Sequence, residues 1–488
     1  MKKMICNMLF CMIMALTILN MTACDGGNAD NERGSGVDVS DDSNVEKDEK
    51  DISRSELQDE ELPEDNQANH GTYKVMETEL GYYYNLGLVN SVQNEKGLTI
   101  SNRDNLMNMF FFDKEAGIAV QLCDKPECHH QQTNDCVATY NKLWVIGQDI
   151  YDGYLYTYGE EKDDEISRFS LYRTALDGSA IDRVGVVMEA ENKSESAYII
   201  KPDLTLGDFG DGMIIHKGYA YLPYYLRVGT TMKGFKGGGI KRMNLKTGET
   251  ETVFEMPDSN GRYPYQMIGD GDYVYFWMYD KHWQQDWFRY DTITGTYEKS
   301  PWEKECKGVM QAIKGNIIYT VTSEVDIIDD SKKNKQYINM LLAYKIRDNE
   351  SVEKICEIEI NKSDRTYAGN NKGILVYKDY FVVIHGEKLT VYSAKPENFG
   401  NVLGELAYDA EWSQYSNDYA EFKINNDKIY RVYQKPRLEN EEWNKIGHAE
   451  RGPYINHGRF YQSCPIEDII KGKGVWTESY RTLFEESE

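Results

Sequence analysis

Basic residues are in short supply in this chain of 488 residues. It contains 55 lysines and arginines against 81 aspartates and glutamates, which gives a formal net charge of -26. A surface of this sign repels nucleic-acid phosphates and anionic lipid headgroups. The composition therefore predicts no nucleic-acid partner and no membrane attachment through a basic patch.

Proline is also scarce, with 11 residues, and no proline- or serine-rich linker divides the chain after residue 70. Residues 71–488 are too many for one ordinary hydrophobic core. Long helical periodicity is missing as well, which argues against α/β and helical-repeat folds. One large all-β domain built from repeated sheets explains how so long a chain can fold without a dividing linker.

Catalytic signatures are missing too. The chain contains no H-E-x-x-H, G-x-S-x-G, P-loop or dinucleotide-binding pattern. Aspartate and glutamate are abundant, so a pair of carboxylates for glycosidase chemistry stays open. These absences favour a binding or scaffold protein over an enzyme.

A long apolar run lies at the N-terminus, from Met4 to Ala23, behind two lysines. A positive start, an apolar core and small residues before Cys24 are typical of a bacterial lipoprotein signal peptide. The stretch resembles a lipobox, although Met21 stands where leucine is usual, and the resemblance implies acyl chains on Cys24. Two such chains anchor a protein stably. An uncleaved signal anchor is the alternative, because a spanning helix needs about 20 apolar residues. We predict a signal peptide over residues 1–23 and a lipid-anchored protein that faces outside the bacterial cell membrane.

Residues 24–70 contain no aromatic side chain, and sixteen acids and four bases give residues 25–70 a charge of -12. Such a segment cannot bury enough apolar surface to offset its ordering entropy. We expect a disordered acidic linker between the lipid and the folded domain. Once the two lysines of the leader are set aside, residues 71–488 keep a charge of -16. The lipid on Cys24 is therefore the expected membrane attachment.

From Tyr73 onward a loose repeat appears. Each unit opens with an apolar strand, a tight turn and an alternating aromatic strand, and the clearest copies are 145–158, 214–225 and 267–278. Short turns of this kind are a hairpin signal. Further copies begin at residues 311, 375 and 422, and a first unit covers 72–122. Four-stranded sheets at this spacing are typical of a β-propeller. We predict a β-propeller of about seven blades over residues 71–488, and six or eight blades also fit the irregular spacing.

The second half of a unit ends at a turn closed by glycine, as in 170–178, 240–248 and 287–295. The first of these reads SLYRTALDG, and a second motif, LCDKPECHH, covers residues 122–130. Both resemble motifs of uncharacterised propeller-like lipoproteins of Gram-positive anaerobes, which carry an LCxKPxCxH cluster and LYRxxLDG repeats in a domain of unknown function. The resemblance implies a propeller fold and a location at the cell surface, and it implies no established activity.

Three of the nine cysteines fall within 14 residues. Cys123, Cys128, His130 and Cys136 have the short spacing of a tetrahedral Cys₃His zinc site. A disulfide between two of the cysteines is the alternative, because export permits it. A stretched form of the c-type haem attachment motif is a third interpretation, and unpaired thiols are a fourth. Four protein ligands leave no open position, so the metal expected here is a structural zinc ion.

Aromatic residues crowd one hairpin and its loop, at Trp277, Tyr279, Trp283 and Trp287. Exposed aromatic rings can stack on sugars, whereas buried ones pack between blades. We take these four as candidate ligand-binding residues. The sequence thus predicts a lipid-anchored propeller that binds carbohydrate, peptide or an envelope protein; the alternative is a glycosidase or lyase acting on extracellular polysaccharide.

Overall fold

The computed structural model describes residues 76–88, 91–93, 99–101, 106–116, 118–125, 136–138, 143–162, 166–191, 197–199, 213–228, 235–256, 264–279, 285–329, 334–348, 350–363, 374–385, 388–408, 421–434 and 459–481. The chain divides into two compact units, residues 1–60 and 61–488. Every described residue belongs to the second unit.

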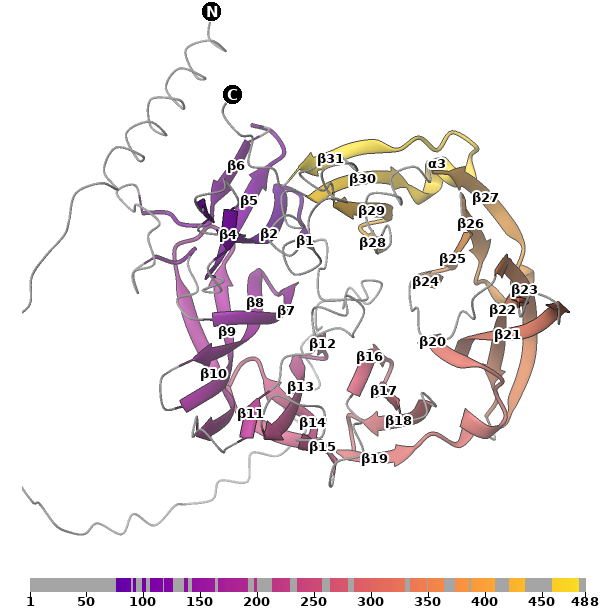
Figure 1. The fold of residues 1–488 in the computed structure, drawn as a ribbon, viewed down its shortest axis with the longest axis horizontal. Helices are drawn as coiled ribbons and strands as arrows, with labels where there is room; N and C mark the ends of the chain where they lie inside the picture. The colour runs from indigo at the N-terminus through magenta and orange to yellow at the C-terminus, as the bar shows by residue number, and fades with distance from the viewer. Residues whose placement is uncertain are drawn as a thin grey trace, which may run out of the picture. The chain divides into compact units, whose positions relative to one another are not determined.

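Seven antiparallel sheets follow one another around a ring, so the unit is a seven-bladed β-propeller (Figure 1). Within each blade the four main strands are hydrogen-bonded in chain order, and the first strand lies nearest the centre of the ring. This confirms the predicted fold class and the favoured number of blades.

The first three blades come from residues 76–256. Blade 1 contains β1 (Met76–Glu77), β2 (Gly81–Leu88), β5 (Leu106–Asp113) and β6 (Ile118–Gln121), with a small separate hairpin of β3 (Ser91–Gln93) and β4 (Thr99–Ser101). Blade 2 contains β7 (Leu143–Tyr151), β8 (Tyr154–Lys162), β9 (Ile166–Ala175) and β10 (Ile181–Glu191). Blade 3 contains β11 (Ala197–Ile199), β12 (Ile214–His216), β13 (Tyr219–Val228), β14 (Phe235–Asn244) and β15 (Thr250–Met256).

The remaining four blades come from residues 264–481. Blade 4 contains β16 (Pro264–Asp270), β17 (Tyr273–Tyr279), β18 (Gln285–Asp291) and β19 (Thr296–Lys299), followed by the 3₁₀ helix η5 (Pro301–Lys304). Blade 5 contains β20 (Val309–Lys314), β21 (Ile317–Asp329), β22 (Asn334–Ile346) and β23 (Val352–Ser363). Blade 6 contains β24 (Ile374–Tyr377), β25 (Tyr380–His385), β26 (Lys388–Ser393), the 3₁₀ helix η6 (Pro396–Asn398) and β27 (Val402–Ala407). Blade 7 contains β28 (Glu421–Asn425), β29 (Lys428–Gln434), β30 (Arg459–Pro465), the helix α3 (Ile466–Ile470) and β31 (Thr477–Arg481).

Tight turns, formed by residues with positive φ or closed by side-chain hydrogen bonds, end several of these strands. Between β7 and β8, Asp152 and Gly153 both have positive φ, at 47° and 74°. This backbone form matches the right-handed twist of the paired strands. The turn between β14 and β15 is closed differently, because the Asn244 side chain accepts hydrogen bonds from the backbone N–H groups of Lys246 and Thr247. Asp291 repeats that arrangement in blade 4.

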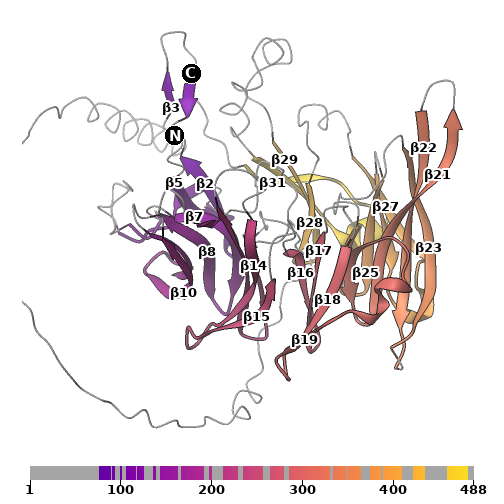
Figure 2. The same ribbon diagram turned by 60° about the horizontal axis from the view of Figure 1, so that its bottom comes forward.

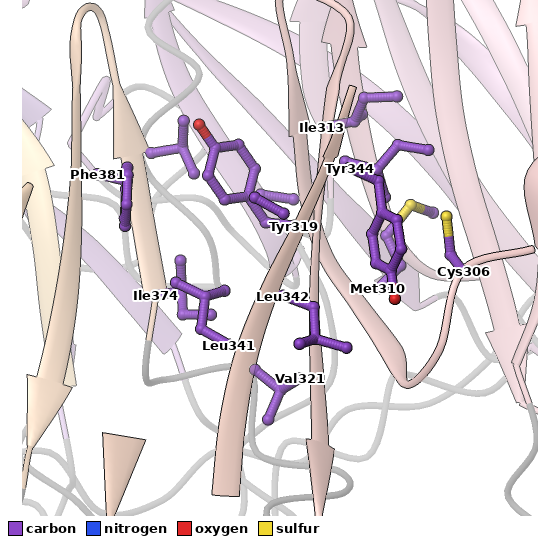
Figure 3. Close-up of a cluster of buried hydrophobic side chains, with 14 of the residues drawn as sticks. Cys306, Met310, Ile313, Tyr319, Val321, Leu341, Leu342, Tyr344, Ile374 and Phe381 are labelled. Atoms are coloured by element: carbon purple, nitrogen blue, oxygen red, sulfur yellow. The ribbon is translucent and has the colours of Figure 1, made fainter. Parts of the chain in front are cut away.

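The core lies between the blades, because alternate residues of one strand face opposite neighbours. In β17, Val274 and Phe276 belong to the cluster shared with blade 3, whereas Tyr275 and Trp277 belong to the cluster shared with blade 5. Figure 3 shows the cluster of blades 5 and 6, where the Tyr319 and Phe381 rings lie 5.5 Å apart, centroid to centroid. Large aromatic side chains thus fill the space between neighbouring sheets.

The junction between blades 7 and 1, where the two ends of the propeller chain meet, is built in another way. Among the described residues, five hydrophobic clusters cover the other six junctions, and none of them joins blade 7 to blade 1. Each described strand of blade 7 also comes from residues 421–481, so no strand is shared across this seam. The seam is instead held by polar side chains around Glu77.

The Glu77 carboxylate is 2% exposed and accepts contacts from both blades. Lys114 of blade 1 lies 2.7 Å from one carboxylate oxygen, and Lys428 of blade 7 lies 2.9 Å from the same oxygen. The Tyr430 hydroxyl donates to the other oxygen, and the Tyr82 and Tyr430 rings meet edge to face. Burial disfavours the charged form, but the hydrogen bonds from Lys114, Tyr430 and Lys428 outweigh it and lower the pKa of Glu77 below 4.5. Glu77 is therefore an ionised link between the first and last blades.

Candidate functional site

The two ends of the propeller differ in how the strands are connected. Antiparallel order places alternate connections at opposite ends of a sheet. The connections from first to second strand and from third to fourth strand are all short, and the longest of them spans residues 466–476. We call this end the turn end. The other end, the loop end, receives every longer connection.

At the turn end, neighbouring blades are linked through their first hairpins. Lys217 of blade 3 pairs with Asp272 of blade 4, and Asp270 of blade 4 accepts a hydrogen bond of 2.8 Å from the Gly315 N–H of blade 5. Lys378 of blade 6 pairs with both carboxylate oxygens of Asp427 at 2.9 Å. These short, partnered turns are suited to holding the ring together.

The connections longer than residues 466–476 all lie at the loop end, and they span residues 89–105, 122–142, 192–213, 408–420 and 435–458. In blade 5 the strands themselves reach further, since β21 continues to Asp329 although its pairing with β20 stops at Val321. Figure 2 shows β21 and β22 rising beyond the neighbouring strands. A surface with this variety of connections is the natural place for a binding site in a propeller.

The structure places the predicted aromatic residues in two groups. Trp277 is 0% exposed and Trp287 is 1% exposed, and both belong to the cluster of blades 4 and 5. Their rings have no free face for a sugar, so for these two the prediction of a ligand-binding role is corrected to packing. The alternation of β17 turns Trp277 toward blade 5, and Trp287 is its cross-strand partner on β18. The Tyr279 side chain and Trp283 lie outside the described residues.

The predicted zinc ligands are described only in part. Cys123 follows β6 and is half-buried, and Cys136 is 3% exposed. Cys128 and His130 lie outside the described residues, as does Cys24. Within the described part of the chain, no three His, Cys, Asp or Glu side chains are grouped as a metal site. The described part also contains no helix with the length and apolar character needed to cross a membrane.

Three acids among the described residues have shifted pKa values, and all three shifts are downward. In Asp177 the hydrogen bonds from Ser179 lower the pKa. In Asp291 burial opposes ionisation, but hydrogen bonds from the Thr294 and Ile293 N–H groups outweigh it and lower the pKa. Glu77 behaves in the same way at the seam. A general acid needs a raised pKa, so none of these three carboxylates is poised to act as a general acid.

Sequence reasoning missed Glu77, whose two charged partners come from two different blades. Its neighbours Lys428 and Tyr430 lie more than 350 positions away along the chain. A short β1 strand and two acids in the stretch METEL, Glu77 and Glu79, gave no local signal. Its position in the first strand of the first blade, where a ring must close, is the signal that could have found it.

No protein-family model matches the chain, and no curated protein matches it. Among solved structures, an uncharacterized protein from Listeria monocytogenes is 11% identical over 69% of this chain and 82% of its own, with a TM-score of 0.36. An oligogalacturonate lyase in complex with manganese is 12% identical over 75% and 94%, with a TM-score of 0.36. A puromycin hydrolase is 9% identical over 85% and 55%, with a TM-score of 0.43. Similarities this distant carry no substrate or activity over to this chain.

Proposed function

We propose that this protein is a lipid-anchored β-propeller of the bacterial cell surface that binds a carbohydrate, a peptide or an envelope protein through its loop end. The observation that carries the proposal is the separation of connections. Short, partnered turns gather at one end of the ring, and the long connections gather at the other. Long surface connections held by a rigid scaffold are where binding residues are often found.

The location rests on the sequence around Cys24. A lipobox-like stretch, an acidic linker and a net charge of -16 over residues 71–488 together favour attachment through lipid alone. Growth with a radioactive fatty acid tests this attachment. We expect label on the full chain and none on the Cys24→Ser variant. Label that persists on the variant would contradict the anchor.

The binding face is tested with arrays of glycans and peptides, followed by titration of every hit. The loop-end connections 280–284, 408–420 and 435–458 contain Trp283, Trp412 and Trp443. We expect Trp283→Ala and Trp443→Ala to weaken binding at least about tenfold, the usual effect of removing an aromatic anchor. The control is Tyr154→Ala, an exposed aromatic residue that starts β8 at the turn end. Equal losses in all three variants would remove the loop end as the binding face.

Each hit is also assayed for turnover. A bound glycan recovered unchanged agrees with a binding or scaffold protein. A shortened or unsaturated product would replace that function with the glycosidase or lyase alternative.

A further inference from the structure

The second strand of blade 5 runs far beyond the first strand at the loop end. β21 is paired with β20 only as far as Val321, but it stays paired with β22 up to Asp329. In the neighbouring blade 6, β25 is paired with β24 as far as Val383 and ends at His385. Figure 2 shows the far ends of β21 and β22 beyond the neighbouring strands. Residues 322–329 therefore extend the sheet past the point where its innermost strand stops.

The chain that leads into β20 does not continue along this extension. The Lys307 N–H donates to the Tyr344 hydroxyl at 3.0 Å, and the Lys307 carbonyl accepts from the Thr320 hydroxyl at 2.6 Å. These contacts hold Lys307 beside residues of β21 and β22 that precede the extension. Among the described strands, β22 is the only one that pairs with β21 from Glu324 to Asp329.

Blade 3 shows what fits beside such an extension. β12 is paired with β13 only as far as Tyr221, although β13 continues to Val228. The extra length of β13 is paired with a separate strand, β11, whose Ala197 and Ile199 lie opposite Val228 and Leu226. β11 lies on the same edge of β13 as β12, and it is antiparallel to β13. In blade 3, an added strand thus occupies the position that no described strand occupies in blade 5.

The backbone and the charges of β21 indicate which strand could be added. Alternate residues of an antiparallel strand direct their N–H and C=O groups to opposite neighbours, so an edge strand presents a template for another strand. Residues 324–329 read EVDIID, with three acids and no base. Like charges that face each other across paired strands are destabilising, whereas opposite charges are stabilising. The edge therefore disfavours pairing with a second copy of itself and favours a basic strand.

We propose that an extended basic peptide segment of a partner protein binds as an added strand along Glu324 to Asp329, antiparallel to β21 and in line with β20. The inference rests on the proposed function, because it names the ligand class that the loop end binds. Main-chain hydrogen bonds provide the affinity of such a complex, and the lysine and arginine residues of the peptide provide selectivity against the acids of β21.

Peptide titrations on the full chain test the proposal. The probe is a short labelled peptide of alternating lysine and valine, compared with a peptide of alternating glutamate and valine. A third peptide repeats the lysine–valine sequence with every backbone nitrogen methylated, so it keeps the charges and loses the N–H donors. We expect the first peptide to bind, and the other two to bind at least about tenfold more weakly.

A charge reversal on the protein gives the matched variant. Glu324→Lys combined with Asp329→Lys should lose affinity for the lysine–valine peptide and gain affinity for the glutamate–valine peptide. A gain of binding cannot come from misfolding. The control is Glu357→Lys combined with Glu359→Lys, the same change of charge at two exposed positions of β23, on the other edge of blade 5. It should leave the preference for the lysine–valine peptide unchanged.

Hydrogen exchange locates the bound strand. The lysine–valine peptide should slow exchange of the amides in residues 324–329. Absence of binding, absence of this protection, or equal affinity of the methylated peptide would each overturn the proposal. A dimer in sedimentation that separates in the Glu324→Lys, Asp329→Lys variant would also overturn it, because a second copy would then occupy the edge.

The glycan and peptide array hits distinguish this inference from the proposed function. A hit that binds more weakly to Trp443→Ala but equally well to the Glu324→Lys, Asp329→Lys variant would overturn the strand pairing and leave the loop end as the binding face. A hit that both variants bind as tightly as the wild type would count against both.

Discussion

The junction of blades 4 and 5 and the seam of blades 7 and 1 each hold two neighbouring blades together. The first uses apolar packing, and the second uses a buried charge with its hydrogen bonds. At the first, Trp277, Trp287 and Trp302 are fully buried in one apolar cluster. At the second, the described contacts include a buried carboxylate, two lysines and a tyrosine hydroxyl. The first junction joins neighbours in the chain, whereas the second joins residues 351 positions apart.

The difference shows what each kind of contact contributes. Apolar burial is strong but non-directional, so it suits blades whose order the chain already sets. Hydrogen bonds to a buried charge are directional and demand a defined geometry. A seam without a shared strand needs such alignment, and the Glu77 contacts supply it. Removing each group should therefore have a different size of effect and a different dependence on pH.

The largest effect is expected at the junction of blades 4 and 5. Trp277→Ala removes a side chain that is 0% exposed, and it should lower the free energy of unfolding by about 3 to 5 kcal/mol. Trp277→Phe should cost less, because the Trp277 indole N–H has no hydrogen-bond partner among the described residues. Urea unfolding of both variants measures this. A loss from Trp277→Ala below about 1 kcal/mol would contradict a packing role.

The next largest loss of stability is expected at the junction of blades 1 and 2, on the side of blade 1 away from the seam. Gly178→Ala forces an alanine to φ +76° and places its Cβ 2.8 Å from the Cys123 nitrogen. It should cost about 2 to 4 kcal/mol, the strain of the left-handed backbone plus the clash. Gly153→Ala is the matched control in the same blade, with φ +74° and open space around the added atom, and should cost about 1 to 2 kcal/mol. Equal costs would mean that the contact between blades 1 and 2 adds nothing.

At the seam itself, Glu77→Ala leaves Lys114, Lys428 and Tyr430 without their common partner. We expect a loss of about 2 kcal/mol, the usual size for hydrogen bonds to a charged group. The described contacts of Glu77 reach both blades 1 and 7, so the variant should also expose the first blade. Hydrogen exchange of blade 1 amides, compared with those of blade 4, measures that exposure. Unchanged exchange in blade 1 would show that other contacts close the ring.

The sequence alone predicted the blades but not how the ring closes. Alternating strands and glycine turns are local signals, so the hairpins at 145–158, 214–225 and 267–278 matched β7–β8, β12–β13 and β16–β17. The same alternation cannot tell an aromatic ring that packs between blades from one that faces solvent. Trp277 and Trp287 were therefore named as ligand-binding candidates although they are buried. The partners of Glu77 come from the far end of the domain, where no local pattern could indicate them.

Acid should weaken the seam specifically. The pKa of Glu77 is lowered in the folded protein, so its contribution to stability is complete above pH 4.5 and is lost as the pH falls through the folded-state pKa. We expect the stability difference between wild type and Glu77→Gln to shrink as the pH falls below 4.5, whereas the cost of Trp277→Ala stays constant. A difference that persists at low pH would contradict the ionised link.

The smallest effect is expected for an ion pair that also joins two blades but lies in water. Lys378 of blade 6 meets both oxygens of Asp427 of blade 7 at 2.9 Å, yet the two side chains are 53% and 61% exposed. Water and salt screen such a pair, so Lys378→Ala should cost at most about 1 kcal/mol and less at high salt. Glu77→Ala should lose little of its effect in salt, because its carboxylate is 2% exposed. The Lys378–Asp427 and Glu77–Lys428 contacts have similar lengths. If Lys378→Ala cost as much stability as Glu77→Ala, the strength of the seam would come from the contact between blades and not from burial of the charge.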